Sequence, residues 1–410
     1  MERRSAALTL ILLASLLGLA YGRAGYTDPE VFQHDIGEFN VRYTISFDDL
    51  TAGADASNRG ITTILAEGLA SDGVSIEHLM PIASNTYAPH SSPNSLGAAG
   101  DNQFLAGNSD KVTFTFIRPI YAFGLYLVGN PSPTGVPAIP FWRMRTDLGT
   151  ELFSATEPLS SLGRGDDVYF LGIVSGKPFT QVELFSDNDP AAVFSFNIDD
   201  VIWCTYATPA SSVSAKSLVD GTDILLSGVI VTREHSDRFN VETADRSSGI
   251  AVCGLGGNRG RAISLYGTLA INPNGERVIN LLQIISQTSA TAPGPLGMTT
   301  RSVGGGASNG LQVGCTESTG LNNIGLDVTI TGRVTAVASD YSWMTVDDGC
   351  GRSSGTGSPG VCVVGAIGNR QEGELVRLSG SVSLFPSGGK HYPLIRVAHI
   401  KDLFVFPIKR

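Results

Sequence analysis

The amino-acid sequence predicts an all-β protein that is divided into several domains. Glycine is frequent, with 49 among 410 residues, and only 16% of the residues are charged. Valine, isoleucine and threonine gather in short runs separated by stretches rich in glycine, proline and serine, which is typical of strands joined by turns. No long segment shows the 3.6-residue apolar period of a helix. Because one domain typically holds about 100–200 residues, this chain is expected to form two or three.

The first 22 residues have the pattern of a secretory signal peptide. Arg3 and Arg4 precede an apolar run over residues 6–20, and the small residues Ala20 and Gly22 then form a cleavage signal. The run is shorter than the roughly 20 residues that a membrane-spanning helix needs, and no later run reaches that length. We therefore expect residues 1–22 to be removed and the protein to be secreted or held at the cell surface, without a membrane span.

The cysteine content fits an exported chain. The five cysteines are Cys204, Cys253, Cys315, Cys350 and Cys362. Outside the cell they can oxidise, and an odd number leaves at least one without an intramolecular partner. Cys350 and Cys362 flank one glycine- and serine-rich loop between two predicted strands, so we expect a disulfide between them. No pair has the C-x-x-C spacing of a zinc or redox site.

Residues 23–206 are predicted to form a β-sandwich. In this segment Val112, Phe114 and Phe116 alternate with lysine and threonine, so one face of the strand is buried and the other lies in water. The same alternation returns after Pro119. The predicted strands are 45–50, 111–129, 168–174, 179–187 and 193–203. Several such strands separated by polar loops favour two packed sheets.

A repeated unit occupies the rest of the chain. Residues 207–217, rich in alanine, serine and proline, are predicted to be a linker. Two copies of one β-unit follow at 218–287 and 311–410, separated by a glycine- and proline-rich connector at 288–310.

Glycines align the two copies. Gly228 matches Gly332, and Gly267 matches Gly380. Each copy contains five predicted strands, and a glycine inside a strand favours the bend that closes a small barrel.

Two parts of the chain resemble known families. The sequences FDDL (47–50), SPNSLG (92–97) and IDDV (198–201), with the 111–129 run, resemble jelly-roll domains of the carbohydrate-binding-module type in secreted bacterial surface proteins. The repeats resemble tandem OB-fold-like domains of secreted bacterial proteins, through DGTDILLSGVIV, SLYGTLAINPNGER and PLGMTTRSVGGG. The resemblance implies a jelly-roll β-sandwich followed by two small OB-like β-barrels, with polysaccharide as the ligand of the sandwich.

The candidate metal site consists of two aspartate pairs. Asp48 and Asp49 lie at the end of the first predicted strand, and Asp199 and Asp200 lie in the last strand of the sandwich. In jelly-roll binding modules the terminal strands lie side by side, so the resemblance implies that these carboxylates hold a structural calcium ion, which takes six to eight oxygen ligands. The alternative is that they are solvated strand ends. Residues 187–189 form a second oxygen-rich loop.

Charge separates the two halves of the chain. The first 205 residues carry 11 Lys and Arg against 23 Asp and Glu, and the remainder carries 17 against 15. An acidic domain suits cations and neutral glycans but does not attract polyanions. Barrels of the OB type bind nucleic acid by stacking bases on aromatic side chains in a basic groove. The aromatic candidates are Phe239, Tyr266, Tyr341, Trp343 and Tyr392. Because basic residues do not cluster, nucleic acid is not the expected partner and stays the alternative.

No catalytic arrangement is visible in the sequence. The six histidines show neither HExxH nor i, i+4 spacing. Trp142, Tyr87 and Tyr169 have the chemistry to stack on sugar rings, although core packing is the commoner role of such residues. We therefore expect a polysaccharide-binding protein, with the repeats as a spacer or second binding unit, and not an enzyme. An accessory hydrolase, which needs paired carboxylates about 5–9 Å apart in a cleft, is the alternative.

Overall fold

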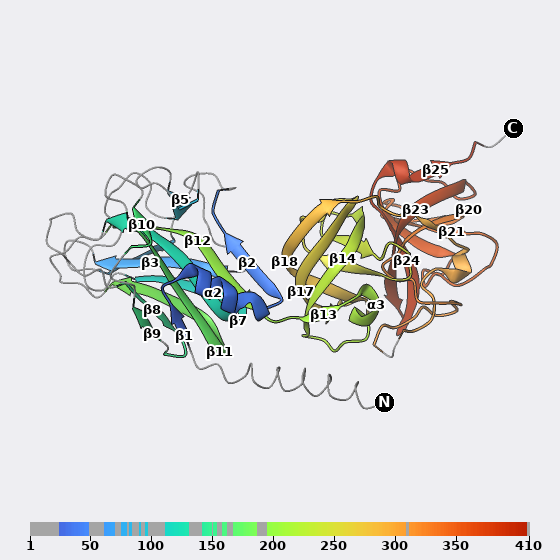
Figure 1. Ribbon diagram of the computed structural model, residues 1–410. Helices are drawn as coiled ribbons and strands as arrows, with labels where there is room; N and C mark the ends of the chain where they lie inside the picture. The colour runs from blue at the N-terminus through green and yellow to red at the C-terminus, as the bar shows by residue number, and fades with distance from the viewer. Residues whose placement is uncertain are drawn as a thin grey trace, which may run out of the picture. The chain divides into compact units, whose positions relative to one another are not determined.

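The computed structural model describes residues 24–48, 61–69, 75–79, 82–83, 90–91, 95–96, 111–130, 142–149, 151–153, 158–161, 167–186, 195–308 and 311–407. The chain divides into two compact units, Met1–Tyr206 and Ala207–Arg410, here called the N-terminal and C-terminal units. Both consist of strands with a few short helices (Figure 1), so the all-β class is confirmed. The predicted signal peptide lies outside the described residues. In the described part, no helix is long and apolar enough to cross a membrane.

Twelve strands of the N-terminal unit belong to one sheet within the described residues. In chain order its elements are β1 (Ala24–Tyr26), α2 (Pro29–Asp35), η2 (Ile36–Glu38), β2 (Val41–Ile45), β3 (Ile61–Leu69), β4 (Ser75–Leu79), β5 (Ile82–Ala83), β6 (Ser95–Leu96), β7 (Lys111–Asn130), β8 (Trp142–Thr146), β9 (Glu151–Phe153), β10 (Ser160–Ser161), β11 (Asp167–Ser186) and β12 (Ser195–Thr205). The sheet runs β5-β6-β12-β7-β11-β8-β9, with β2 on β12 and β3 on β7.

The long strand β7 bends back on itself near Pro119. The rings of Phe114 and Phe123 lie 5.0 Å apart, although nine residues of straight strand would separate them by about 30 Å. Strand β11 shifts its register with β7 between Val174 and Phe179. The sheet therefore folds into two packed layers, and the side chains between them, such as Phe114 and Phe123, are fully buried.

A short helix covers the outer face of one layer. Helix α2 begins after Asp28, whose carboxylate accepts a hydrogen bond from the backbone N–H of Glu30 at 2.8 Å. Its Phe32 is fully buried against Gly124 and Gly172, which face each other across β7 and β11. A Cβ atom at Gly172 would lie 2.6 Å from the Phe32 ring. The two glycines therefore form the slot that receives this ring.

One strand prediction is displaced along the chain. The expected strand 45–50 begins where β2 ends, at Ile45. Phe47 has a φ of 65°, which extended backbone does not allow, so the strand stops before the first aspartate pair.

The C-terminal unit contains two barrels of the same construction. Their elements are β13 (Thr208–Ala210), α3 (Ser212–Ala215), β14 (Asp223–Glu234), β15 (Arg238–Glu242), β16 (Gly249–Cys253), β17 (Arg261–Ile271) and β18 (Arg277–Ser289), then β19 (Leu296–Gly297), η3 (Thr300–Ser302), β20 (Asp327–Val337), β21 (Trp343–Asp347), β22 (Val361–Gly365), β23 (Leu375–Ser387), β24 (Lys390–Val397), η4 (Ile400–Asp402) and β25 (Leu403–Val405). Five strands close each ring, in the orders β14-β15-β16-β18-β17 and β20-β21-β22-β24-β23. The pairs β16–β18 and β22–β24 are parallel.

The two barrels have equivalent residues at the predicted glycines of the fourth strand. Ile224 pairs with Gly267 in the first barrel, and Val328 pairs with Gly380 in the second. A Cβ atom at either glycine would meet the neighbouring strand at 2.5 or 2.4 Å. The close approach of the backbones therefore explains why both positions are glycine.

The other predicted match, between Gly228 and Gly332, is shifted by one residue in the structure. Gly228 has a φ of 69° and lies where the register between β14 and β17 shifts, so it belongs to a bulge. Gly332 pairs regularly with Val376 in the second barrel. The bulge adds a residue to β14 that the sequence match does not reveal.

Two segments that were expected to link domains are parts of the barrels. Residues 207–217 form β13 and α3, with Ser212 and Ala215 fully buried, and residues 288–310 contain β19, η3 and the fully buried Val303. Strands β13 and β19 pair in parallel with the first ring strand of their barrels. The small side chains of Ser212 and Ala215, which are typical of a linker, are therefore packed inside the first barrel.

In this structure all five cysteines are free thiols, and the expected disulfide between Cys350 and Cys362 is not formed. Cys362 lies in β22 and is 3% exposed. Cys350 lies in the preceding loop, where its Sγ is 3.0 Å from Thr300 Oγ1. The loop therefore directs the Cys350 side chain toward η3.

The loop between the second and third ring strands differs between the barrels. It spans residues 243–248 in the first barrel and 348–360 in the second. In the longer loop, Arg352 is 3% exposed and donates to the carbonyls of Val303 at 3.0 Å and Thr316 at 2.7 Å. The carbonyl of Pro359 accepts a hydrogen bond from Thr335 Oγ1 at 2.6 Å. The loop is thus fixed against β20 and η3.

The barrels contact each other through buried polar groups. Asn240 Nδ2 donates to the Gly325 carbonyl at 3.1 Å, and Glu242 accepts the backbone N–H of Asp327 at 2.6 Å. Arg233 Nη2 lies 2.7 Å from Asp327 Oδ1. Burial raises the pKa of Glu242 to about 7. Strand β15 of the first barrel is therefore hydrogen-bonded to the start of β20 in the second barrel.

Candidate functional site

The structure brings together three of the four aspartates that the sequence singled out. Val201 of β12 pairs with Ile45 of β2, so the end of β2 lies beside the middle of β12. Asp48 follows β2, and its charge helps to raise the pKa of Asp199. Asp49 lies outside the described residues, as does the 187–189 loop.

Asp199 is a buried carboxylate that holds a distant loop. Its side chain is fully buried. It accepts hydrogen bonds from the backbone N–H groups of Ser91 at 2.7 Å and of Asp200 at 2.8 Å. Burial, together with the charges of Asp200 and Asp48, raises its pKa to about 7. Asp199 therefore fixes residues 90–91 against β12.

The neighbouring Asp200 faces outward because the strand is irregular. Its φ is 44°, and the register with β7 shifts between Asp199 and Ile202. Its carboxylate lies 2.7 Å from His90 Nδ1, and the side chains of these two residues are 15% and 34% exposed. The His90 ring stacks on Tyr126 with centroids 3.7 Å apart. Asp200, His90 and Tyr126 form one partly exposed polar group, here called the β12 cluster.

The donor set suits an oxygen-seeking cation only in part. Asp48, Asp199 and Asp200 could supply carboxylate oxygens to calcium, which needs six to eight. The carboxylate of Asp199 already accepts hydrogen bonds from two backbone N–H groups. Among the described residues, only Asp347, Asp348 and Cys350 bring three possible ligand atoms within 4.8 Å of one another.

The Asp347–Asp348–Cys350 group is explained by its loop. Asp348 accepts hydrogen bonds from the backbone N–H and the hydroxyl of Thr300 at 2.9 and 2.5 Å. Asp347 accepts the backbone N–H of Gly349 at 3.1 Å. These carboxylates hold the start of the 348–360 loop.

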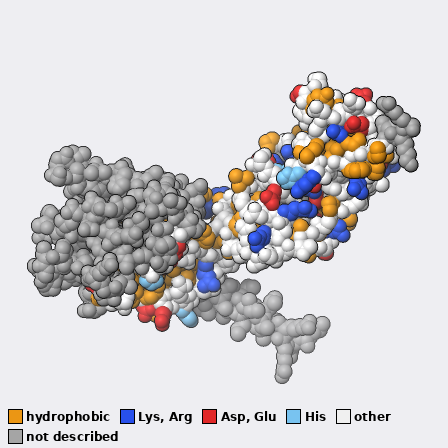
Figure 2. Space-filling view, turned by 90° about the horizontal axis from the view of Figure 1, so that it is seen from above, with side chains coloured by type: hydrophobic (Ala, Val, Ile, Leu, Met, Phe, Trp, Pro, Cys, Tyr) orange, Lys and Arg blue, Asp and Glu red, His pale blue; other side chains and the backbone are white. Residues whose placement is uncertain are grey.

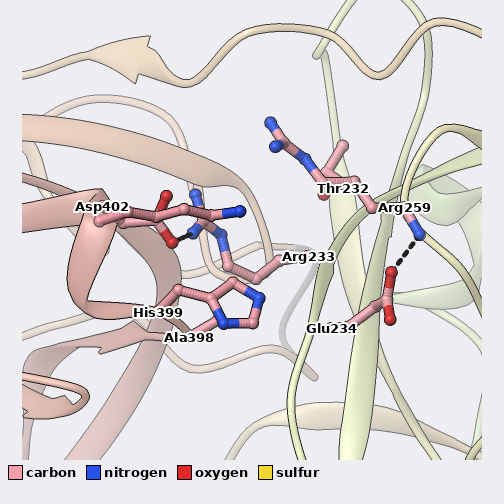
Figure 3. Close-up of a pocket in the computed structure, with 8 residues that line it drawn as sticks. Thr232, Arg233, Glu234, Arg259, Ala398, His399 and Asp402 are labelled. Atoms are coloured by element: carbon pink, nitrogen blue, oxygen red, sulfur yellow. Dashed lines mark hydrogen bonds and ion pairs between the residues drawn. The ribbon is translucent and has the colours of Figure 1, made fainter.

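A pocket of about 180 Å³ lies between strands of the two barrels in the C-terminal unit (Figure 3). Its lining residues are Thr232, Arg233, Glu234, Arg259, Ala398, His399, Lys401 and Asp402. The first barrel contributes the end of β14 and the residues before β17. The second barrel contributes the segment from β24 to η4. Figure 3 shows Glu234 and Arg259 on one side, and His399 and Asp402 on the other.

Buried ion pairs form one wall of this pocket. Arg233 is 4% exposed and contacts Asp327, which is 1% exposed, as well as Asp402. Burial raises the pKa of Asp327, while the charges of Arg233 and Arg259 oppose that effect. The positive charge of Arg233 is thus already paired with two carboxylates of the protein, those of Asp327 and Asp402.

The rim of the pocket is solvent-exposed. Arg259, His399 and Lys401 are exposed, and within the described residues their side chains have no hydrogen bond or ion pair. Glu234, also exposed, accepts the backbone N–H of Arg259.

The aromatic residues considered for stacking are divided between core and surface. Trp142, Tyr169, Phe239 and Tyr266 are at most 4% exposed, so they belong to the cores. Tyr341 is 45% exposed. Tyr87 lies outside the described residues, and Trp343 and Tyr392 are partly buried.

Sequence reasoning missed the partners of both sites. His90 and Ser91 lie 108 or more residues from Asp199 and Asp200, and Arg233 lies 169 residues from Asp402. No local pattern marks such pairs. The one available signal was that His90 and Ser91 directly precede the SPNSLG sequence.

No protein-family model matches the chain, and no curated protein matches it.

Proposed function

We propose that this chain is an exported binding protein whose N-terminal unit is a jelly-roll sandwich that binds polysaccharide at the β12 cluster. The C-terminal unit would be a pair of OB folds. The ring order, with the third and fifth strands parallel and the first strand pairing with both the second and the fourth, supports this assignment. The signal-peptide pattern of residues 1–22 supports export.

The observation that carries the proposal is the anchored, partly exposed β12 cluster. A sugar hydroxyl both donates and accepts hydrogen bonds, so its site needs an acceptor and a donor side by side. Asp200 offers carboxylate oxygens, and His90, whose Nδ1 lies 2.7 Å from that carboxylate, offers its other ring nitrogen. Asp199 holds His90 and Ser91 in place from within the protein. Such fixed geometry favours recognition of a rigid, polyhydroxylated chain.

Calcium would act on this cluster through charge. Burial is the main cause that raises the pKa of Asp199 to about 7, and repulsion by the negative charges of Asp200 and Asp48 adds to it. A divalent cation would reduce that repulsion and keep Asp199 ionised at neutral pH. We therefore propose that calcium strengthens glycan binding through the loop that Asp199 holds.

We do not propose nucleic acid as the ligand. On the face seen in Figure 2, the Lys and Arg side chains of the C-terminal unit are interspersed with Asp and Glu instead of forming a basic stripe. Phe239 and Tyr266 are buried, so they offer no stacking surface.

The test is affinity electrophoresis of the full chain through gels that contain soluble polysaccharides, with calcium and with chelator. Asp200→Asn keeps the side-chain shape and a residue type that tolerates positive φ. The control is Glu30→Gln, an exposed residue of the same unit in α2. We expect at least one glycan to retard the wild type and the control but not Asp200→Asn, with weaker retardation in chelator. Absence of retardation by every glycan, or equal retardation of both variants, would reject the proposal.

A further inference from the structure

The pocket in the C-terminal unit has no role in the proposal above. Its lining is almost entirely polar, with Ala398 as the one apolar side chain among its lining residues. Arg233 is occupied by Asp327 and Asp402. The groups left to a ligand are therefore the exposed side chains of Arg259, His399 and Lys401, and the carboxylate of Glu234.

The charges around the pocket balance. The cationic side chains are Arg233, Arg259 and Lys401, and the anionic ones are Glu234, Asp402 and, behind Arg233, Asp327. A phosphate or sulfate site would require an excess of positive charge, as in clusters that bind anions through several arginines. A pocket with no net charge that offers both donors and an acceptor instead suits hydroxyl groups, each of which donates one hydrogen bond and accepts others.

The size of the pocket limits the ligand. Its volume of about 180 Å³ is below the roughly 300–1,000 Å³ of pockets for drug-sized ligands. That space takes one ring-sized polar unit.

We propose that this pocket binds a single neutral sugar unit. Arg259 and Lys401 donate to its hydroxyl oxygens, and Glu234 accepts from its hydroxyl groups. Figure 3 shows Glu234 and Arg259 on one side of the pocket and His399 on the other, so the site exists only where the two barrels are joined. The C-terminal unit is then a second saccharide-binding unit, built from other residues than the β12 cluster and independent of it.

The test is ligand-observed saturation-transfer NMR on the full chain. The probes are the methyl glycosides of glucose, galactose and mannose, with glucuronate, galacturonate and sodium sulfate as the charged alternatives. The variants are Arg259→Gln and Glu234→Gln, both at exposed positions, so folding is expected to be retained. The matched control is Arg261→Gln, two residues further along, which contacts Ser289 and does not line the pocket. Asp200→Asn removes the contribution of the N-terminal unit.

We expect saturation transfer to at least one neutral glycoside in the wild type, in Arg261→Gln and in Asp200→Asn. Arg259→Gln and Glu234→Gln are each expected to weaken its Kd by about tenfold, because each removes a charged hydrogen-bonding group. Loss in Asp200→Asn alone would assign the binding to the β12 cluster and overturn the inference. Competition by sulfate or the uronates without binding of any neutral glycoside would overturn it as well, as would the absence of binding by every probe.

Discussion

Asp327→Asn is expected to destabilise the C-terminal unit strongly. Asp327 is 1% exposed, and its two oxygens accept hydrogen bonds from Arg233 Nη2 at 2.7 and 2.9 Å. Asparagine has the same shape but leaves the buried guanidinium with Asp402 as its remaining anionic partner among the described residues. Breaking a buried ion pair by removing one partner costs about 3–5 kcal/mol. Because Asp402 remains, we expect about 3 kcal/mol.

The repeat supplies a matched control for this experiment. Asp223 pairs with Thr268 in the first barrel as Asp327 pairs with Ser381 in the second, so the two aspartates are equivalent. Asp223 accepts hydrogen bonds from hydroxyl groups, among them Thr268 Oγ1 at 2.6 Å. Asparagine keeps one oxygen that can accept such a bond, so only part of the roughly 1.5–3 kcal/mol of a hydrogen bond to a charged group is lost. Asp223→Asn is therefore expected to be the milder change.

The assay is hydrogen–deuterium exchange along a urea series, read by mass spectrometry on peptides from β15 and β20. These strands meet at the contact between the barrels, so their exchange reports its stability directly. Equal losses in the two variants, or a loss below about 1 kcal/mol in Asp327→Asn, would show that the Arg233 pair is not the buried contact described here. The variant Arg233→Met/Asp327→Leu should recover most of the stability, because it removes both charges together.

Three further predictions concern packing and pH. Gly172→Ala should lower the stability of the N-terminal unit by about 1–3 kcal/mol through overpacking against Phe32. The control is Gly37→Ala, where a Cβ atom meets nothing within 4 Å, so no loss of stability is expected. Thermal denaturation compares the two variants. The raised pKa of Asp199 means that the folded state holds a proton more tightly than the unfolded state, so stability from this group falls as pH rises from about 3.8 to about 7. Asp199→Asn should flatten that slope in urea titrations, and an unchanged slope would contradict the assignment. Burial lowers the pKa of Lys216 to about 8 from 10.5, so stability from this group should rise with pH across that interval, and Lys216→Met should remove the rise.

Local sequence patterns predicted where strands lie, but not where a strand ends or contains a bulge. The alternation of Val112, Phe114 and Phe116 identifies β7 because a strand with one buried face repeats every two residues. The positive φ of Phe47, which ends β2, has no such signature, because any side chain can be forced into it by its surroundings. The bulge at Gly228 is likewise invisible in a match of glycines.

Composition also misled where small residues are buried. Ser212 and Ala215 are fully buried beneath the first barrel, although alanine and serine in a proline-containing stretch are typical of linkers. Burial depends on what pairs with β13, and that partner is β14, more than ten residues later.

The sequence predicted only those contacts of the candidate sites that follow from the pairing of neighbouring strands. The proximity of Asp48 to Asp199 follows from terminal strands that lie side by side, and β2 does pair with β12. His90 comes from an unrelated part of the chain, and its place beside Asp200 depends on the hydrogen bond between Ser91 and Asp199. Pairwise contacts of that kind leave no periodic trace in one sequence.

The longer loop of the second barrel lies against the strand that corresponds to the docking strand of the first barrel. A stack of repeats can grow when the face that receives the next unit is present again on that unit. The first barrel receives the second through Asn240 of β15. The equivalent residue of β21, Thr345, is fully buried. The hydroxyl group of Thr335 is hydrogen-bonded both to Thr345 Oγ1 and to the carbonyl of Pro359 in the 348–360 loop. A third barrel would have to displace this loop before it could dock on β21 in the same way.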